Sequence, residues 1–438
     1  MPKSLISNPM LGRSTAGGAG RKNSAAGDLQ KRRLGTWRSG SQETQDSTPP
    51  LLPSDFYASH LNSLAIRFIP GFDGFHSNGK DHPPSNSKSP TISMSHHVIE
   101  FCAGGGGQGL GLEMAGFDCE AAVEIDADCC TTLRANRPWW DLRNDDMRNV
   151  DATRWRDVDL FAAGVPCPPF SVAGKQLGSE DERDMFPEAL RLIKECEPSA
   201  VLLENVPGFA SAKFDDYRKN LLRQLEKLGY QADWKVLQAA DYGVPQLRPR
   251  FLLVALRPKF FDFFQWPVAF DQRTGVGPAI GDLMSAGGWR GADEWIKKAN
   301  RIAPTVVGGS KKHGGPDLGP TRAKKQWREM CVDGLGIADQ PPRADFDING
   351  HPKLTVRMVA RVQSFPDGWQ FSGKKTAAYR QVGNAFPPLV AKAIGRSIRA
   401  ALQMKRPQAV SSTEQLRFLE TPTAYYVSGH TDKQHPFI

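Results

Sequence analysis

The chain has 438 residues, a formal net charge of +9 and seven cysteines. This length allows two or three domains, and no apolar run approaches the roughly 20 residues that cross a bilayer, so we expect no membrane span. No two cysteines form a CxxC pair, which argues against a structural zinc site, and we expect no metal. Scattered thiols without a secretory signal indicate a reducing cytoplasm. The mildly basic charge permits a polyanionic partner without requiring one.

Residues 1–94 differ in composition from the rest of the chain, being rich in Ser, Gly, Pro and basic residues. Such a segment buries too little apolar surface to offset the entropy lost on ordering. We therefore expect residues 1–94 to be an extension that is disordered or non-native. The composition changes abruptly at Met94, which makes Met94 a candidate start of translation beside Met1.

Short apolar runs alternate with stretches of 3.6-residue periodicity from about residue 96 to residue 258. The expected strands cover residues 97–103, 119–126, 158–164, 200–206 and 249–257, and residues 144–147 end a further strand. The expected helices cover residues 110–117, 126–137, 185–197 and 217–229. This alternation predicts an α/β fold with a mostly parallel sheet covered on both faces, which binds ligands at the carboxyl ends of its strands.

The periodicity fails in residues 259–354, which are rich in Gly, Pro, Lys and Trp. We expect this segment to form a second, smaller and loop-rich domain. Periodicity returns after it, so residues 355–402 are expected to complete the first domain, which begins with residues 95–258. Residues 403–438 are expected to be a tail.

A glycine-rich turn between the first strand and the first helix indicates a cofactor site. Gly104, Gly106 and Gly109 satisfy G-x-G-x-x-G, and Glu124 lies 20 positions beyond Gly104. Glycines let the backbone turn tightly, and an acid after the second strand binds ribose hydroxyls. The pattern predicts an adenosine-containing cofactor without choosing between a dinucleotide and S-adenosylmethionine. Asp146 ends another strand and is expected to accept a hydrogen bond from the adenine amino group.

Cys167 stands between Pro166, Pro168 and Pro169 just after an apolar strand. Proline fixes φ and lacks an N–H, so this thiol lies on a rigid loop at a strand end, where it can act as a nucleophile. Glu204 ends the next strand, beside the same cleft, where desolvation raises a carboxyl pKa.

Two arginines, Arg248 and Arg250, open a later strand in "QLRPRF". Their guanidinium groups can bind phosphate or polarise a carbonyl. Together with Cys167 and Glu204, which are expected at strand ends, they form a set of four candidate catalytic residues.

The chain closely resembles the C5-cytosine-specific DNA methyltransferases of bacteria, of the restriction–modification type. The matching motifs occur in order: "FCAGGGGQGLG", "EID", "DDM", "GVPCPPFSVAGKQ", "ENVPGF", "QLRPRF", "RMVARVQSFPD" and "QVGNAFPPLVAKAIG". They cover about residues 96–260 and 353–400. The resemblance implies a Rossmann-like, S-adenosylmethionine-dependent methyltransferase domain, and a target-recognition domain at residues 259–354.

The resemblance also implies a mechanism. Cys167 would add to C6 of a cytosine flipped out of the duplex, Glu204 would protonate N3, and C5 would accept the methyl group. Arg250, and with it Arg248, would bind the O2 side and order the site. The prolines around the thiol would then hold the sulfur in near-attack geometry.

By position, the resemblance carries over two sets of binding residues. The cofactor contacts would be Phe101, Gly104, Gly106, Glu124, Ile125, Asp146, Met147, Pro166 and Asn384. The DNA contacts would be Ser171, Lys175, Lys311, Lys312, His313, Arg322, Lys324, Lys325 and Arg328. The chain departs from the family pattern at Cys102, which replaces an aromatic residue, and at Pro168, where the family often has glutamine.

Three alternatives stay open from the sequence: a cytosine-5 methyltransferase acting on tRNA, a catalytically silent DNA-binding regulator, and a nicotinamide oxidoreductase. The main expectation is an enzyme that methylates cytosine in a specific sequence of double-stranded DNA. It would act as a monomer on the nucleoid of a prokaryotic cytoplasm, functionally paired with a restriction endonuclease.

Overall fold

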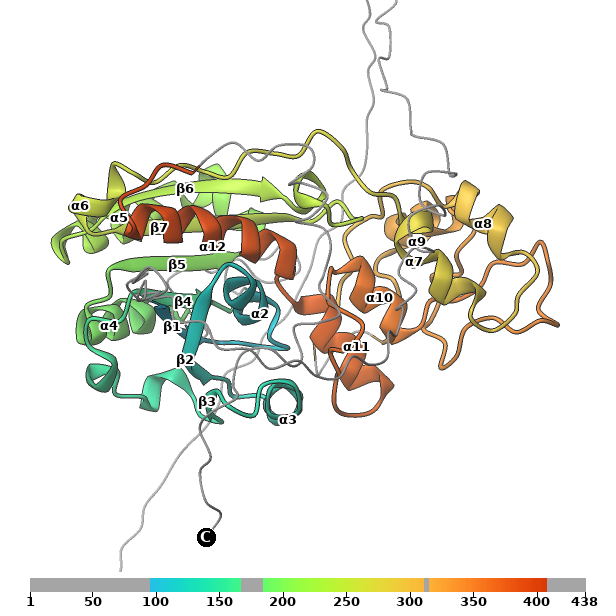
Figure 1. Ribbon diagram of the computed structural model, residues 1–438, viewed down its shortest axis with the longest axis horizontal. Coiled ribbons are helices and arrows are strands. Elements are labelled where there is room, and N and C mark those ends of the chain that lie inside the picture. Colours follow the sequence, from blue (N-terminus) through green and yellow to red (C-terminus); the bar gives the residue numbers. More distant parts are fainter. Residues whose placement is uncertain (1–94, 167–183, 311–314, 408–438) are drawn as a thin grey trace, which may run out of the picture. The chain divides into compact units, whose positions relative to one another are not determined.

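The computed structural model describes residues 95–166, 184–310 and 315–407. Its centre is a seven-stranded sheet with the order β3-β2-β1-β4-β5-β7-β6 (Figure 1). The strands are β1 (His96–Phe101), β2 (Phe117–Val123), β3 (Asp141–Arg143), β4 (Leu160–Gly164), β5 (Ala200–Asn205), β6 (Gln231–Gln238) and β7 (Pro249–Leu256). The expected strands are confirmed, and β6 is an additional one that the periodicity did not reveal.

The strand order determines where a ligand can enter the sheet. β1 to β5 are parallel, and β7 runs antiparallel to both β5 and β6. The chain builds outward from β1 through β2 to β3, then returns to build from β4 in the other direction. The connections after β1 and β4 therefore leave on opposite faces, and a crevice opens between the carboxyl ends of these two strands.

Helices cover both faces of the sheet. Side chains alternate along each strand, so both faces carry apolar side chains against which helices pack. Phe161 and Leu203 face one apolar cluster, which includes Leu192 of α4, whereas Leu160 and Leu202 face the other. Helices α2 and α12 pack on the second face (Figure 1). The helices around the sheet are α2 (Gly107–Met114), α3 (Ala127–Asn136), α4 (Phe186–Cys196), α5 (Asp215–Lys227) and α12 (Pro388–Leu402). The expected α/β methyltransferase fold is confirmed.

The segment after β7 contains short helices separated by long irregular stretches. They are α6 (Pro258–Phe261), α7 (Val276–Ser285), α8 (Ala292–Lys298) and α9 (Thr321–Glu329), followed by α10 (Val356–Val362) and α11 (Lys375–Asn384). Helices α7 to α11 share a core that contains the buried indoles of Trp295, Trp327 and Trp369, whereas Phe260 of α6 packs in the cluster on the sheet. Helices this short give too few turns for a clear periodicity in the sequence, so the segment looked more irregular than it is.

Helices α2 and α12 approach so closely that only glycine fits between them. A Cβ atom on Gly111 would lie 2.3 Å from the Pro388 carbonyl oxygen and 2.4 Å from the Ala391 Cβ. We predict that Gly111→Ala lowers the free energy of unfolding by about 1–3 kcal/mol, since overpacking outweighs the helix propensity gained. Urea unfolding measures this change.

Gly336→Ala is the matched control, because its nearest neighbour would be the flexible Lys353 side chain at 3.6 Å. Equal unfolding midpoints for both variants would contradict the close approach of α2 and α12.

Candidate active site

A cavity of about 600 Å³ lies at the carboxyl ends of β1 and β5. Gly104 and Glu124 line one part of it, and Glu204 and Asn384 line another. The structure thus brings four of the expected cofactor residues, Gly104, Glu124, Ile125 and Asn384, into one cavity with the expected catalytic carboxyl of Glu204. The other expected cofactor residues do not line this cavity: Phe101, Gly106, Asp146, Met147 and Pro166.

The glycine-rich turn and Glu124 hold each other in place. Gly104 and Gly106 have φ values of 55° and 86°, which favour glycine. The Glu124 carboxylate accepts the N–H groups of Gly104 and Asp126, both at 2.7 Å. Burial raises the Glu124 pKa, and these two hydrogen bonds oppose the rise. No atom of the described residues lies within 4 Å of the position that a Cβ atom on Gly104 would take. The turn is therefore accessible to a ligand.

Two buried polar side chains that the motif did not single out also line this cavity. Glu100 is 1% exposed and Gln108 is 4% exposed. Within the described part of the chain, Oε2 of Glu100 and both amide atoms of Gln108 have no hydrogen-bond partner. Because buried polar groups without partners are costly, this pair fits a cavity that receives a polar cofactor such as S-adenosylmethionine. Sequence reasoning overlooked Gln108, which sits among glycines at the start of α2.

The residues next to the turn divide between cavity and core. Phe101 is fully buried and stacks on Phe161 with ring centroids 5.1 Å apart, so its ring lies in the core. Cys102 lines the cavity instead, and its thiol contacts the Met147 sulfur at 3.6 Å. Ile125 is 65% exposed beside Glu124, which leaves an apolar surface open at the rim of the cavity.

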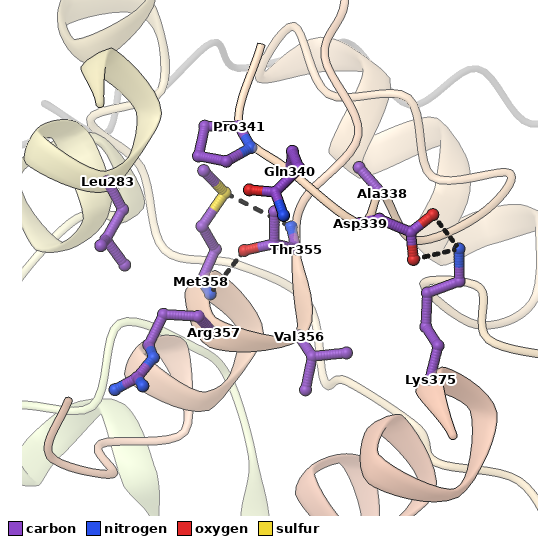
Figure 2. Close-up of a pocket in the computed structure, with 10 residues that line it drawn as sticks. All are labelled: Leu283, Ala338, Asp339, Gln340, Pro341, Thr355, Val356, Arg357, Met358 and Lys375. Carbon is purple, nitrogen blue, oxygen red and sulfur yellow. Dashed lines mark hydrogen bonds and ion pairs between the residues drawn. The ribbon is translucent and has the colours of Figure 1, made fainter. Parts of the chain in front are cut away.

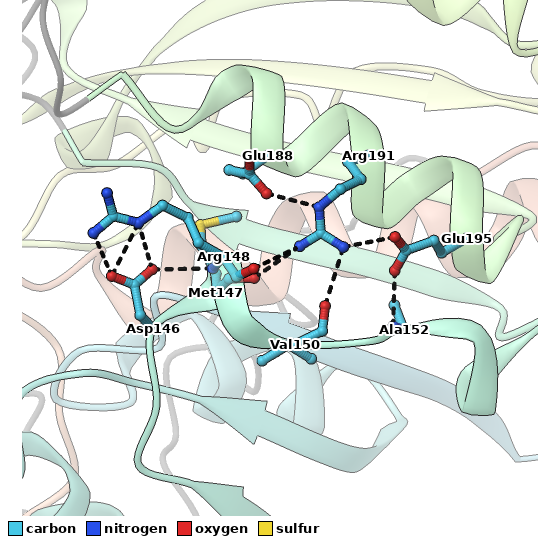
Figure 3. Close-up of polar contacts among 8 residues, drawn as sticks. All are labelled: Asp146, Met147, Arg148, Val150, Ala152, Glu188, Arg191 and Glu195. Atoms are coloured by element: carbon cyan, nitrogen blue, oxygen red, sulfur yellow. Dashed lines mark hydrogen bonds and ion pairs between the residues drawn. The ribbon is translucent and has the colours of Figure 1, made fainter.

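Asp146 follows β3, as expected, and its carboxylate is bound by Arg148 (Figure 3). Nε of Arg148 lies 3.0 Å and 3.1 Å from the two carboxylate oxygens. This hydrogen-bonded pair lowers the Asp146 pKa, so the carboxylate stays ionised and able to accept a further hydrogen bond.

Arg191 of α4 fixes the turn that carries Asp146 and Met147 (Figure 3). Its guanidinium donates to Glu188 at 2.7 Å and to Glu195 at 2.6 Å. It also donates to the carbonyl oxygens of Met147 and Val150, both at 3.1 Å. A rigid planar donor of this kind holds side chains and main chain in one arrangement.

Glu204, near the carboxyl end of β5, forms a buried ion pair with Arg250, near the start of β7. Arg250 Nε lies 2.7 Å from Glu204 Oε1, and the two side chains are 10% and 9% exposed, respectively for Glu204 and Arg250. Burial raises the Glu204 pKa, while the charges of Arg250 and Arg248 oppose that rise. A carboxyl group whose pKa is raised holds its proton more readily than a free one, which suits it to act as an acid.

The chain that leads toward Cys167 runs beside Glu204. Gly164 and Glu204 are paired in the parallel register of β4 and β5. The Asn205 side-chain amide donates to the Val165 carbonyl oxygen at 3.2 Å, and Pro166 follows, half-buried. Cys167 itself lies outside the described residues, as do Ser171 and Lys175.

Arg248 makes contacts of a different kind from those of Arg250. It is 1% exposed, and its guanidinium donates to the carbonyl oxygens of Val306, Gly383 and Ala385, at 2.5, 2.8 and 2.9 Å. These contacts hold two separate segments, the one around Val306 and the end of α11, against the start of β7. Gln246, a residue that the sequence analysis did not single out, also binds this region, accepting the Val306 N–H at 3.0 Å.

The expected DNA-binding residues fall into two groups. The first group lies outside the described residues and comprises Ser171, Lys175, Lys311, Lys312 and His313. Helix α9 carries the others: Arg322, Lys325 and Arg328 are exposed, and Lys324 pairs with Asp317 at 2.8 Å. Asn384 of α11 donates to the Gly309 carbonyl oxygen at 3.0 Å, so the segment before Lys311 reaches the cavity.

A second cavity, of about 330 Å³, lies between α7, α10 and the start of α11 (Figure 2). Arg357 and Lys375 contribute positive charge to it, but Lys375 is paired with Asp339 at 3.0 Å. Of the expected catalytic residues that the structure describes, none lines this cavity. Among the described helices, none is both long and apolar enough to cross a membrane.

We predict that Glu100→Gln changes how stability depends on pH. Burial raises the Glu100 pKa from 4.5 to about 8, opposed by a hydrogen bond from the Gly109 backbone. Between these values the unfolded wild type releases a proton that the folded protein keeps, so its free energy of unfolding falls as pH rises. Glutamine has no such proton, so the variant gains stability relative to wild type between pH 5 and pH 8 in urea unfolding.

Glu120→Gln makes the same substitution at an exposed position of β2 and serves as the control. A stability difference between Glu100→Gln and wild type that stays constant from pH 5 to pH 8 would refute this reading of the buried carboxyl.

Comparison with known proteins identifies the family. Residues 96–400 match the family described as C-5 cytosine-specific DNA methylase. The Type II methyltransferase M.NaeI of Lentzea aerocolonigenes is 52% identical, covering 73% of this chain and 79% of its own length. The Type II methyltransferase M.NgoMIV of Neisseria gonorrhoeae is also 52% identical, covering 71% of this chain and 99% of its own length.

A solved structure of the methyltransferase EhMeth from Entamoeba histolytica shares the fold, with a TM-score of 0.51 and 15% identity. It covers 71% of this chain and 99% of that one. The glycine turn, the buried Glu204–Arg250 pair and the family match agree with one another. The chain belongs to the C-5 cytosine-specific DNA methylase family and is a DNA (cytosine-5-)-methyltransferase that uses S-adenosylmethionine.

Proposed function

We propose that catalysis proceeds through a covalent bond between the Cys167 sulfur and C6 of a flipped-out cytosine. The observation that carries this proposal is the buried Glu204–Arg250 pair, next to the strand end that leads toward Cys167. Cytosine C5 is a poor nucleophile, and a thiolate added to C6 makes it electron-rich. A base stacked inside a duplex does not expose C6, so the cytosine must leave the helix.

The roles of the side chains follow from charge. As the thiolate bonds to C6, negative charge develops at N3, and Glu204 delivers a proton there. Arg250 balances the Glu204 charge and faces the O2 side, while Arg248 orders the surrounding segments. S-adenosylmethionine would transfer its methyl group to C5 and leave as S-adenosylhomocysteine. Loss of the C5 proton to a base, with return of the N3 proton to Glu204, then lets the thiolate leave, which restores the aromatic ring and the free enzyme.

For target recognition we propose that residues 259–354 contact the major groove, where each base pair shows a distinct edge. The exposed basic residues of α9 support this proposal, since the opposite side of the helix is packed through Trp327. By sequence position, Ser171, Lys175, Lys311, Lys312 and His313 belong to the same DNA-contacting set. Residues 95–258 and 355–402 form the catalytic domain.

The cellular role that we propose is restriction–modification. Its support is the relatives named Type II methyltransferases, which align over most of this chain. In this role the enzyme acts as a monomer on the nucleoid, in functional pairing with a restriction endonuclease that cleaves the unmethylated site.

We predict that Cys167→Ser abolishes cytosine methylation and that Glu204→Gln lowers it by roughly 10²–10⁴-fold. The first change removes the nucleophile, and the second removes the proton donor. Bisulfite sequencing of DNA from a methylation-free host that expresses each variant measures the effect and reports the target sequence.

Cys331→Ser is the matched control, because this partly exposed thiol lies far along the chain from every strand end of the site. Full methylation by Cys167→Ser would overturn the covalent mechanism, and full methylation by Glu204→Gln would overturn the role of that carboxyl.

We also predict that neutralising α9 weakens DNA binding in a salt-dependent way. In the triple variant Arg322→Gln, Lys325→Gln and Arg328→Gln, fewer counterions are released on binding. The slope of log K against log salt should therefore become shallower, by roughly 0.9 for each phosphate that the variant no longer neutralises. Fluorescence anisotropy with a cognate duplex at several salt concentrations measures the slope.

The control for this experiment is a triple variant of α5, Lys219→Gln, Arg223→Gln and Lys227→Gln, which removes the same charge from an exposed helix. If the two triple variants show the same slope, α9 has no special role in binding DNA.

A further inference from the structure

The charges around the 600 Å³ cavity are strongly unequal. Glu100, Glu124, Asp126 and Glu204 contribute four carboxyl groups to its lining. Among the described residues that line it, Arg380 is the only one with a permanent positive charge. S-adenosylmethionine carries two positive groups, the sulfonium and the ammonium, and one negative group, the carboxylate. In a site of low dielectric, each charge of a ligand needs an opposite partner.

Arg380 is held firmly in position by the helix that carries it. It lies on α11, one turn before Asn384, and its neighbours anchor that helix. The Gln381 amide accepts a hydrogen bond from Thr132 of α3 at 2.6 Å. The Tyr379 hydroxyl donates to the Asp317 carbonyl oxygen. The guanidinium of Arg380 therefore projects from a fixed point between α11 and the start of α3.

The guanidinium is only weakly engaged by the protein itself. Its side chain is 16% exposed, and its ion pair with Asp128 spans 3.5 Å, through a partner that is 41% exposed. The charge also reaches Cys129, another residue of the cavity lining, since it opposes the rise in thiol pKa that burial causes there. Arg380 thus combines a fixed place, a position at the cavity and donors available for a ligand.

We propose that Arg380 binds the carboxylate of the amino-acid end of S-adenosylmethionine. Glu100 keeps its proton and Glu204 is paired with Arg250, so the carboxylates of Glu124 and Asp126 are the ones that repel this part of the cofactor. A guanidinium offers the paired donors that fit a carboxylate. The assignment goes beyond the glycine turn and Glu124, which account for the adenosine part. It rests on the proposed use of this cavity for the cofactor.

A competing arrangement is visible in the same cavity. The N-cap residue of α2 is Gly106, which has no side chain that could accept a hydrogen bond from the first turn of the helix. N–H groups of that turn are therefore also available to a carboxylate. These neutral donors would bind the cofactor without help from Arg380. The experiment must therefore separate the carboxylate's dependence on Arg380 from its dependence on the backbone.

Isothermal titration calorimetry with two ligands makes this separation. One ligand is S-adenosylmethionine, and the other is its decarboxylated form, which keeps the adenosine, the sulfonium and the amine. Wild type should bind the decarboxylated form roughly ten- to hundredfold more weakly. Arg380→Met should weaken binding of S-adenosylmethionine by a similar factor and leave the decarboxylated form unchanged. Arg380→Lys, which keeps the charge, should fall between the two.

Arg156→Gln is the matched control, because this arginine is 56% exposed in a surface pair with Glu197 and should change neither affinity. Glu124→Gln tests the cavity itself and should weaken both ligands equally. If Glu124→Gln affects neither ligand, the cavity is not the cofactor site and the proposed function fails with it.

If Glu124→Gln acts as expected but Arg380→Met binds both ligands like wild type, the backbone of α2 holds the carboxylate and the assignment of Arg380 is wrong. Should Arg380→Met fail to fold, Arg380→Lys decides between the two arrangements, because wild-type affinity of that variant for S-adenosylmethionine overturns the proposal.

Discussion

The arrangement of the active site depends on the hydrogen bonds that the buried Arg248 guanidinium donates to main-chain carbonyls. Its three acceptors, at Val306, Gly383 and Ala385, belong to the segment after the sheet and to the end of α11. A buried guanidinium without hydrogen-bond partners would destabilise the fold by more than these hydrogen bonds stabilise it, so the segments must meet around it. Arg250, two residues on, is then free to pair with Glu204.

Desolvation explains how one cavity serves two tasks. Burial raises the pKa values of Glu100, Glu124 and Glu204, and the protein opposes that rise differently at each carboxyl. Backbone N–H groups bind Glu124, which suits it to hold hydroxyl groups. The charge of Arg250 opposes the shift at Glu204, which keeps that group able to exchange a proton. The same residue type therefore serves binding at Glu124 and acid–base chemistry at Glu204, because the surroundings of the two carboxyl groups differ.

Much of this site could be predicted from the sequence because its residues stand at strand ends. Glu204 could be predicted because it lies where the apolar run of the strand ending at Asn205 stops. Glu124 could be predicted because it follows the apolar run of the strand after the glycine turn. Partners set by tertiary contact could not be predicted this way. Neither the packing of Phe101 in the core nor the position of Arg380 beside α3 leaves a local pattern. The strand β6 was missed because most of its side chains are not buried.

The central claim is that the sulfur of Cys167 bonds to the target base during catalysis. The most direct measurement is intact mass spectrometry of the enzyme after reaction with S-adenosylmethionine and a cognate duplex containing 5-fluorocytosine. Fluorine at C5 blocks release of the thiolate, so the account predicts a stable protein–DNA species whose cross-linked peptide contains Cys167. An active enzyme that yields no such species, or that forms it equally in Cys167→Ser, would contradict the account.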